Sequence, residues 1–145
     1  MTHGTPMALI GKLHPLVVHF PIGLVLAAAA AEVAAIAAPA WSWRTIAVAN
    51  LRAGAVMGIV TAITGWLLAS SPLVDPTLPV AWHRWVGMAA AVAALGAALV
   101  SFRLRAESRR STLAYRAALF GAALLVAITG HLGGMLVWGA GFFRL

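Results

Sequence analysis

Four of the five histidines lie within or at the ends of long apolar stretches, where a polar side chain is unusual. His14 and His19 begin the first long apolar stretch, His83 begins the third, and His131 lies near the end of the fourth. A buried imidazole is costly without a partner, so an ionisable residue inside a membrane is a candidate functional residue. Imidazoles are the axial ligands of b-type haem, and they also bind copper and zinc. His3, close to the N-terminus, is expected to be solvated.

The composition indicates that the chain, and these histidines with it, lies in a membrane. The chain has 145 residues, of which 63% are hydrophobic and 9% charged, and its mean hydropathy is +0.97. A soluble domain is about half apolar and about a quarter charged. The net charge of +7 does not indicate nucleic-acid binding, because in such a chain arginines mainly set the orientation. Cysteine is absent, which excludes disulfides, iron–sulfur clusters and covalent haem attachment.

Four apolar stretches are long enough to carry the chain across a bilayer as helices. They predict one domain of residues 1–145, an all-α integral membrane four-helix bundle of up-down-up-down topology. The links between them are short, the second contains three prolines, and no internal repeat is evident. The predicted spans are residues 13–38, 45–69, 81–102 and 113–138.

The arginines and tryptophans predict how the bundle is oriented. An even number of spans places both chain ends on one side, together with Lys12, Arg84 and Arg144. The opposite side receives more positive charge, which marks the cytoplasmic face. We therefore expect a bacterial inner (cytoplasmic) membrane protein with both termini periplasmic. The cytoplasmic side receives Arg44, Arg103, Arg105, Arg109 and Arg110, with Trp41 and Trp43, while Trp66, Trp82, Trp85 and Trp138 fall at the other interface.

Depth below the periplasmic face sorts the histidines into two pairs. His19 and His131 lie deeper and form an inner pair, whereas His14 and His83 lie at the boundary and form an outer pair. Two imidazoles at matching depth on facing helices are what b-type haem requires. The inner pair is therefore predicted to hold the haem iron. The alternative for each pair is a hydrogen bond across the bundle or an interfacial polar contact.

Depth in the membrane also suggests which groups the charged residues within or beside the spans would contact. Lys12 and Arg84 lie where haem propionates would emerge, and charge-assisted hydrogen bonds would offset the burial of these groups. Glu32 is the acid inside a span, at a depth close to that of Arg52 and Arg116. We expect a buried ion pair with one of these arginines; a proton-relay carboxylate is the alternative.

Several motifs stand near the ends of the predicted spans. They are Leu13-His14-Pro15-Leu16-Val17-Val18-His19-Phe20-Pro21-Ile22, Thr64-Gly65-Trp66, His83-Arg84-Trp85-Val86-Gly87, Thr129-Gly130-His131-Leu132-Gly133-Gly134 and Gly139-Ala140-Gly141. Together they resemble a known bacterial membrane family, the domain of unknown function 2231. The resemblance covers nearly the whole chain. It implies a layout similar to four-helix membrane cytochromes. Because some members are joined to c-type cytochrome domains, it also implies electron transfer on the extracytoplasmic side, here with a separate partner.

The leading functional hypothesis is a small membrane subunit that binds b-type haem near the periplasmic face. It would carry electrons between a periplasmic c-type cytochrome or a quinol and a larger complex. This role is more typical of an electron-transfer or accessory subunit than of a stand-alone enzyme. One alternative is a cofactor-free structural subunit of a respiratory or photosynthetic complex. A second is a copper or zinc site formed by His14, His19, His83 and His131 together.

Overall fold

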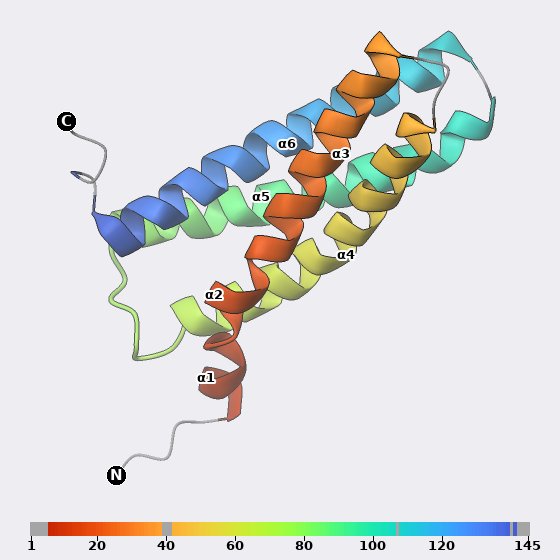
Figure 1. The fold of residues 1–145 in the computed structure, drawn as a ribbon. Coiled ribbons are helices and arrows are strands. Elements are labelled where there is room, and N and C mark those ends of the chain that lie inside the picture. The colour runs from red at the N-terminus through yellow and green to blue at the C-terminus, as the bar shows by residue number, and fades with distance from the viewer. Residues whose placement is uncertain (1–5, 39–41, 107, 140, 142–145) are drawn as a thin grey trace.

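The chain folds into long helices that alternate in direction. The computed structural model describes residues 6–38, 42–106, 108–139 and 141, so His3, Trp41 and Arg144 lie outside the described residues. Figure 1 shows that each long helix runs back along the one before it and that both chain ends lie at the same end of the molecule. The helices are α1 (Pro6–Gly11), α2 (His14–Val17), α3 (His19–Ala37), α4 (Trp43–Ala69), α5 (Leu78–Ser101), the 3₁₀ helix η1 (Phe102–Ala106) and α6 (Arg109–Trp138).

The prediction of an all-α membrane bundle is confirmed. Within the described residues, four helical stretches are long and apolar enough to span a bilayer: 6–37, 43–69, 78–104 and 109–138. Every stretch begins before the predicted start. Pro79 stands in the first turn of α5, where a missing N–H is harmless. Ser108 caps α6, because its Oγ accepts a hydrogen bond from the Ser111 amide at 3.1 Å.

The first span is broken twice near its start, and the breaks have local causes. Pro21 has no N–H, so it cannot bond to the carbonyl four residues earlier, that of Val17. That carbonyl instead accepts a hydrogen bond from Thr61 Oγ1 on α4, at 3.4 Å. At the other break, Gly11 lies so close to α4 that a Cβ there would come within 2.7 Å of the Leu68 amide nitrogen. The segment that carries His14 is therefore fixed against α4.

The interior of the bundle is built from small residues and its surface from large apolar ones. Alanines such as Ala28, Ala97 and Ala122 are buried, whereas Leu99 is 59% exposed and Leu124 is 62% exposed. Small residues let helices approach closely in lipid, and large apolar side chains on the outside suit a hydrocarbon solvent. The core members are Val25, Ala28, Leu51, Ala55, Ala90, Ala94, Ala97, Ala98, Tyr115, Leu119, Ala122, Ala123 and Val126.

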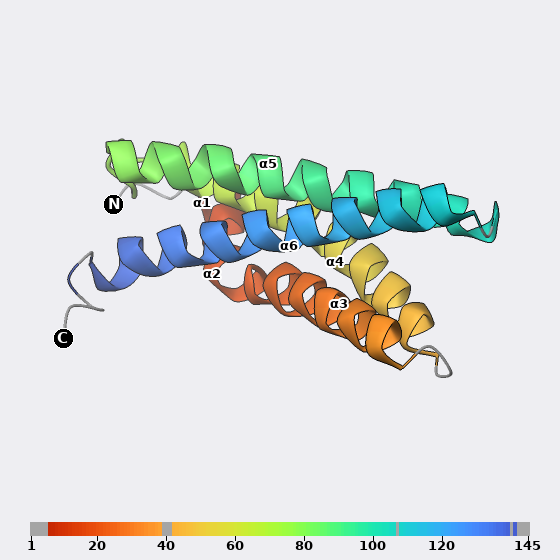
Figure 2. The same cartoon turned by 90° about the horizontal axis from the view of Figure 1, so that it is seen from above.

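The helices form two hairpins that cross each other. Here the first hairpin means α2, α3 and α4, and the second hairpin means α5 and α6. In Figures 1 and 2, α5 and α6 run alongside each other and move apart toward the end of α6, and the first hairpin lies across them at a clear angle. Contacts between α4 and α5 and between α3 and α6 join the hairpins. A cavity lies between them on the side of the bundle where both chain ends are found.

Candidate functional site

The cavity between the hairpins has a volume of about 950 Å³. It receives side chains from α2 to α6, and apolar residues such as Ile22 and Val25 line its inner part. Clefts of about 300–1,000 Å³ are typical of sites for small molecules and cofactors. Its polar lining includes His14, His19, Thr61, His83, Arg84 and Thr129.

His14 is held in one orientation by α4. Its Nδ1 lies 3.1 Å from the Thr61 carbonyl oxygen. A carbonyl only accepts hydrogen bonds, so Nδ1 carries a proton, and in the neutral imidazole this leaves the lone pair on Nε2. Gly65 lies one turn farther along α4, where an added Cβ would come within 2.7 Å of His14 Cε1. Only glycine leaves room for the imidazole at this position.

His83 repeats this arrangement on the second hairpin. Its Nδ1 lies 3.2 Å from the Thr129 carbonyl oxygen on α6. One turn farther, Gly133 faces the ring, and a Cβ there would come within 3.0 Å of His83 Cε1. The second ring is therefore held in the same tautomer, with its Nε2 lone pair left available.

The two imidazoles lie opposite each other across the junction of the hairpins. Their ring centroids are 6.3 Å apart and their planes make an angle of 75°. Both rings line the cavity. The structure therefore brings the outer histidine pair, His14 and His83, together.

The matching surroundings of the two histidines extend to a series of buried positions in the two hairpins. His83 follows His14 by 69 residues, and Thr129 follows Thr61 by 68. No internal repeat is evident in residue identity, and the correspondence between the hairpins lies in which positions are buried. In α4, Ala47, Leu51, Gly54, Ala55 and Gly58 correspond to the buried Tyr115, Leu119, Ala122, Ala123 and Val126 of α6, and in α3, Pro21, Val25, Ala28 and Glu32 correspond to the buried Ala90, Ala94, Ala97 and Ser101 of α5.

The predicted inner pair has different surroundings. His19 and His131 are both exposed residues, and His19 lines the cavity whereas His131 is not among its lining residues. Their assignment as haem ligands remains a prediction. The four-histidine copper or zinc site is not formed: in the part of the chain that the structure describes, no three His, Asp or Glu side chains come close enough to hold one metal ion.

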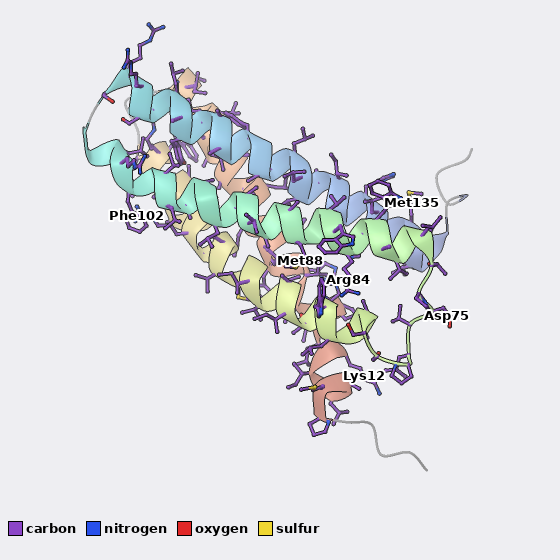
Figure 3. The ribbon with its side chains drawn as sticks, turned by 180° about the vertical axis from the view of Figure 1, so that it is seen from behind. Lys12, Asp75, Arg84, Met88, Phe102 and Met135 are labelled. Atoms are coloured by element: carbon purple, nitrogen blue, oxygen red, sulfur yellow. The ribbon has the colours of Figure 1, made fainter. Side chains whose placement is uncertain are left out.

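The two cations predicted to meet haem propionates are also placed differently. Arg84 lines the cavity, and its guanidinium carbon lies 3.2 Å from the centroid of the Trp66 ring. Trp66 in turn packs edge-on against Trp85, with ring centroids 5.8 Å apart. Lys12 is exposed and does not line the cavity. In Figure 3, Arg84 lies between α5 and α4, and Lys12 lies apart from it near α1.

The opposite end of the bundle carries a buried ion cluster. Glu32 is fully buried, and its Oε1 accepts hydrogen bonds from Arg44 Nη2 at 2.7 Å and Arg116 Nε at 2.8 Å. The predicted pairing with Arg116 is confirmed. Of the two expected partners, Arg116 is the one that pairs with Glu32, whereas Arg52 Nε donates to Ser101 Oγ at 3.0 Å. Arg44 was assigned to a loop by the sequence, but it lies in the first turn of α4 and reaches the carboxylate from there.

Comparison with known protein families now adds to this geometry. A family model described as a predicted membrane protein (DUF2231) matches residues 11–143. The chain belongs to this family. No curated protein and no solved structure is significantly similar to it. The family's description agrees with the four apolar helices, so the chain is a membrane protein that contacts the lipid bilayer.

Proposed function

We propose that the protein is an electron-transfer subunit in which His14 and His83 bind the iron of a b-type haem. The observation that carries this proposal is the pair of facing imidazoles, 6.3 Å apart, each with its Nδ1 at a backbone carbonyl. The proposal moves the ligand role from the inner pair to the outer pair.

The spacing of the rings fits ligation of one ion from opposite sides. A metal–imidazole nitrogen bond is about 2.0–2.1 Å long, so two ligands on opposite sides of an ion have ring centroids about 6 Å apart. The observed separation is 6.3 Å. Gly65 and Gly133 have no side chain beside the rings, and the cavity of about 950 Å³ adjoins them. The residues present could therefore hold a flat macrocycle at the junction of the hairpins, where His14 and His83 would bind its iron.

The chain's own groups supply orientation and electronic tuning. A hydrogen bond from Nδ1–H to a carbonyl fixes the ring orientation and makes the free nitrogen a better ligand. Thr61 and Thr129 provide these carbonyls from the backbone of helices, so the rings are attached to rigid elements. Apolar residues such as Val25 and Val126 line the cavity and would give a bound group a largely apolar surrounding. When bound, haem would supply one-electron redox chemistry.

Substitution of each histidine tests the assignment. We expect purified wild-type protein to give a pyridine haemochrome spectrum and low-spin absorption. His14→Ala and His83→Ala should each eliminate the low-spin signal, whereas His19→Ala and His131→Ala should retain it. The reverse pattern would restore the inner pair as ligands. Absence of haem from wild-type protein grown with excess haem would leave His14 and His83 as interhelical clamps in a cofactor-free structural subunit.

We further propose that the histidine end faces the periplasm of a bacterial inner membrane. Arg44, Arg103, Arg109 and Arg110 belong to the opposite end, which the positive-inside rule makes cytoplasmic. A periplasmic c-type cytochrome, a quinol or a larger membrane complex would then exchange electrons at the cavity. A C-terminal alkaline phosphatase fusion should be active and a C-terminal green fluorescent protein fusion dark. An inactive phosphatase with a bright fluorescent fusion would contradict this orientation.

A further inference from the structure

The two hairpins differ at the rim of the cavity. His83 follows His14 by 69 residues, and by the same spacing Arg84 of the second hairpin corresponds to Pro15 of the first. The 68-residue spacing of α4 and α6 relates Trp66 to Gly134. All four residues line the cavity. One side of a nearly two-fold site therefore carries a cation stacked on an aromatic ring, and the other side carries neither group.

Arg84 is held in place but lacks a negatively charged partner. Its guanidinium stacks on Trp66, and its Nε is buried without a hydrogen-bond acceptor among the described residues. The ion pairs found in the described part of the chain both involve Glu32, at the other end of the bundle. Asp75 lines the same cavity and forms no ion pair with Arg84. A partly buried guanidinium with an unused donor is a strong site for a carboxylate, which it binds through charge-assisted hydrogen bonds.

We propose that Arg84, positioned by Trp66, binds a carboxylate of the cavity's ligand and so determines which way round the ligand lies between the two histidines. The identification of that ligand as haem rests on the proposed function, since haem carries propionate carboxylates. A fatty acid offers the same chemical group on an apolar chain. Pro15 and Gly134, at the equivalent place on the other side of the cavity, provide no cation. The ligand could lie between the histidines in two orientations, and only the one that points its carboxylate at Arg84 forms this ion pair.

Esterification of the ligand tests the proposal directly, because it removes the carboxylate charge and leaves the rest of the molecule nearly unchanged. The full-length protein in lipid nanodiscs is titrated with haem and with haem dimethyl ester. A separate titration of haem-free protein uses brominated laurate and its methyl ester, followed by quenching of tryptophan fluorescence. Wild-type protein should bind the acid roughly ten- to a hundredfold more tightly than the ester, the range expected for a hydrogen bond to a charged group.

Variants show whether the preference belongs to Arg84. Arg84→Gln should bind acid and ester equally, and Arg84→Lys should retain part of the preference because it keeps the charge without the planar fork. Arg109→Gln, at the other end of the bundle, is the matched control and should behave as wild type. If neither form of haem binds but laurate shows the Arg84-dependent preference, the haem function fails and the carboxylate site stands. Equal binding of acid and ester by wild-type protein, or a preference that survives in folded Arg84→Gln protein, would overturn it. The wild-type comparison decides the matter even if Arg84→Gln does not fold.

Discussion

The two hairpins hold their histidines in the same way but are joined to each other differently. In each, an imidazole bonds to a threonine carbonyl and faces a glycine one turn away. At the other end, Glu32 of the first hairpin pairs with Arg116 of the second, while Ser101, its counterpart, accepts from Arg52 of the first. The shared features surround the histidines. The differences lie in the charge of the links between hairpins.

The comparison distinguishes the groups that hold the histidines from the side-chain pairs that join the two hairpins. A pair of equivalent imidazoles requires equivalent backbones beside them, so the carbonyl and the glycine recur. A link between hairpins requires only a donor and an acceptor, so an arginine can pair either with a carboxylate or with a neutral hydroxyl. The charged link joins the fully buried Glu32 carboxylate to Arg116, whose side chain is 28% exposed. Arg44, in the same hairpin as Glu32 and 35% exposed, also pairs with this carboxylate. The link through Ser101 is neutral on one side and stacks Arg52 over Phe102 at 3.8 Å.

The largest effect is therefore expected from breaking the charged link. Glu32→Gln removes the countercharge of Arg44 and Arg116 and leaves both without an ionic partner. Breaking a fully buried pair costs about 3–5 kcal/mol, and the partial exposure of the arginines lowers the expected loss of unfolding free energy to about 2–3 kcal/mol. Thermal unfolding of the protein in detergent measures it.

Ser101→Ala is the matched substitution in the second hairpin. It removes one hydrogen bond from Arg52, whose stacking on Phe102 remains, so the expected loss is about 1 kcal/mol. Equal losses for Glu32→Gln and Ser101→Ala would mean that the two links are energetically equivalent. An unchanged melting temperature in Glu32→Gln, with electron or proton transfer abolished, would instead make Glu32 a proton-relay group.

Much of the fold follows from the sequence because lipid allows few solutions. Apolar length alone predicts four helices, and the isolated acid Glu32 predicts an ion pair with Arg52 or Arg116, of which Arg116 is the partner found. The first residue of each helix is predicted less well. Serine and proline, as at Ser108 and Pro79, occur both in loops and at the start of helices, so they do not show where a loop ends. The link between Arg44 and Glu32 was missed for the same reason, because it depends on where α4 begins.

The second prediction concerns the glycines that face the rings. A Cβ at Gly65 would meet His14 Cε1 at 2.7 Å, and a Cβ at Gly133 would meet His83 Cε1 at 3.0 Å. Gly65→Ala should therefore displace its imidazole more than Gly133→Ala does, at a cost of about 1–3 kcal/mol for overpacking. Loss of low-spin haem absorption and a lower melting temperature report the displacement.

Gly96→Ala serves as the control, because an added Cβ at that position in α5 meets no atom within 4 Å. Alanine is also the better helix former, so this variant should be unchanged or slightly more stable. If all three glycine variants behave alike, the rings move freely and close packing by glycine is not what orients them.

The histidine pair shows what a linear pattern fails to predict. Depth along a span is readable from sequence, and it favoured His19 and His131. The direction in which a side chain points depends on where the helix is interrupted. The breaks in the first span, at residues 12–13 and at Val18, lie on either side of His14 and alter that direction. The correspondence between the hairpins is equally hidden, since Ala47 and Tyr115, or Gly58 and Val126, share burial and not identity.

The smallest expected effect distinguishes the two threonines that carry the carbonyls. Thr61 Oγ1 donates across the bundle to the Val17 carbonyl at 3.4 Å, whereas Thr129 Oγ1 donates within its own helix to the Leu125 carbonyl at 2.8 Å. Thr61→Val leaves the Val17 carbonyl without this donor beside the Pro21 break and should lower the unfolding free energy by about 1 kcal/mol. In Thr129→Val the Leu125 carbonyl still accepts the backbone hydrogen bond of its own helix. The unfolding free energy should therefore change by less than about 0.5 kcal/mol. Both variants keep the backbone carbonyls that hold His14 and His83, and the low-spin haem spectrum should persist in each. A larger loss in Thr129→Val than in Thr61→Val, measured by thermal unfolding, would show that the cross-bundle hydroxyl bond does not stabilise the broken span.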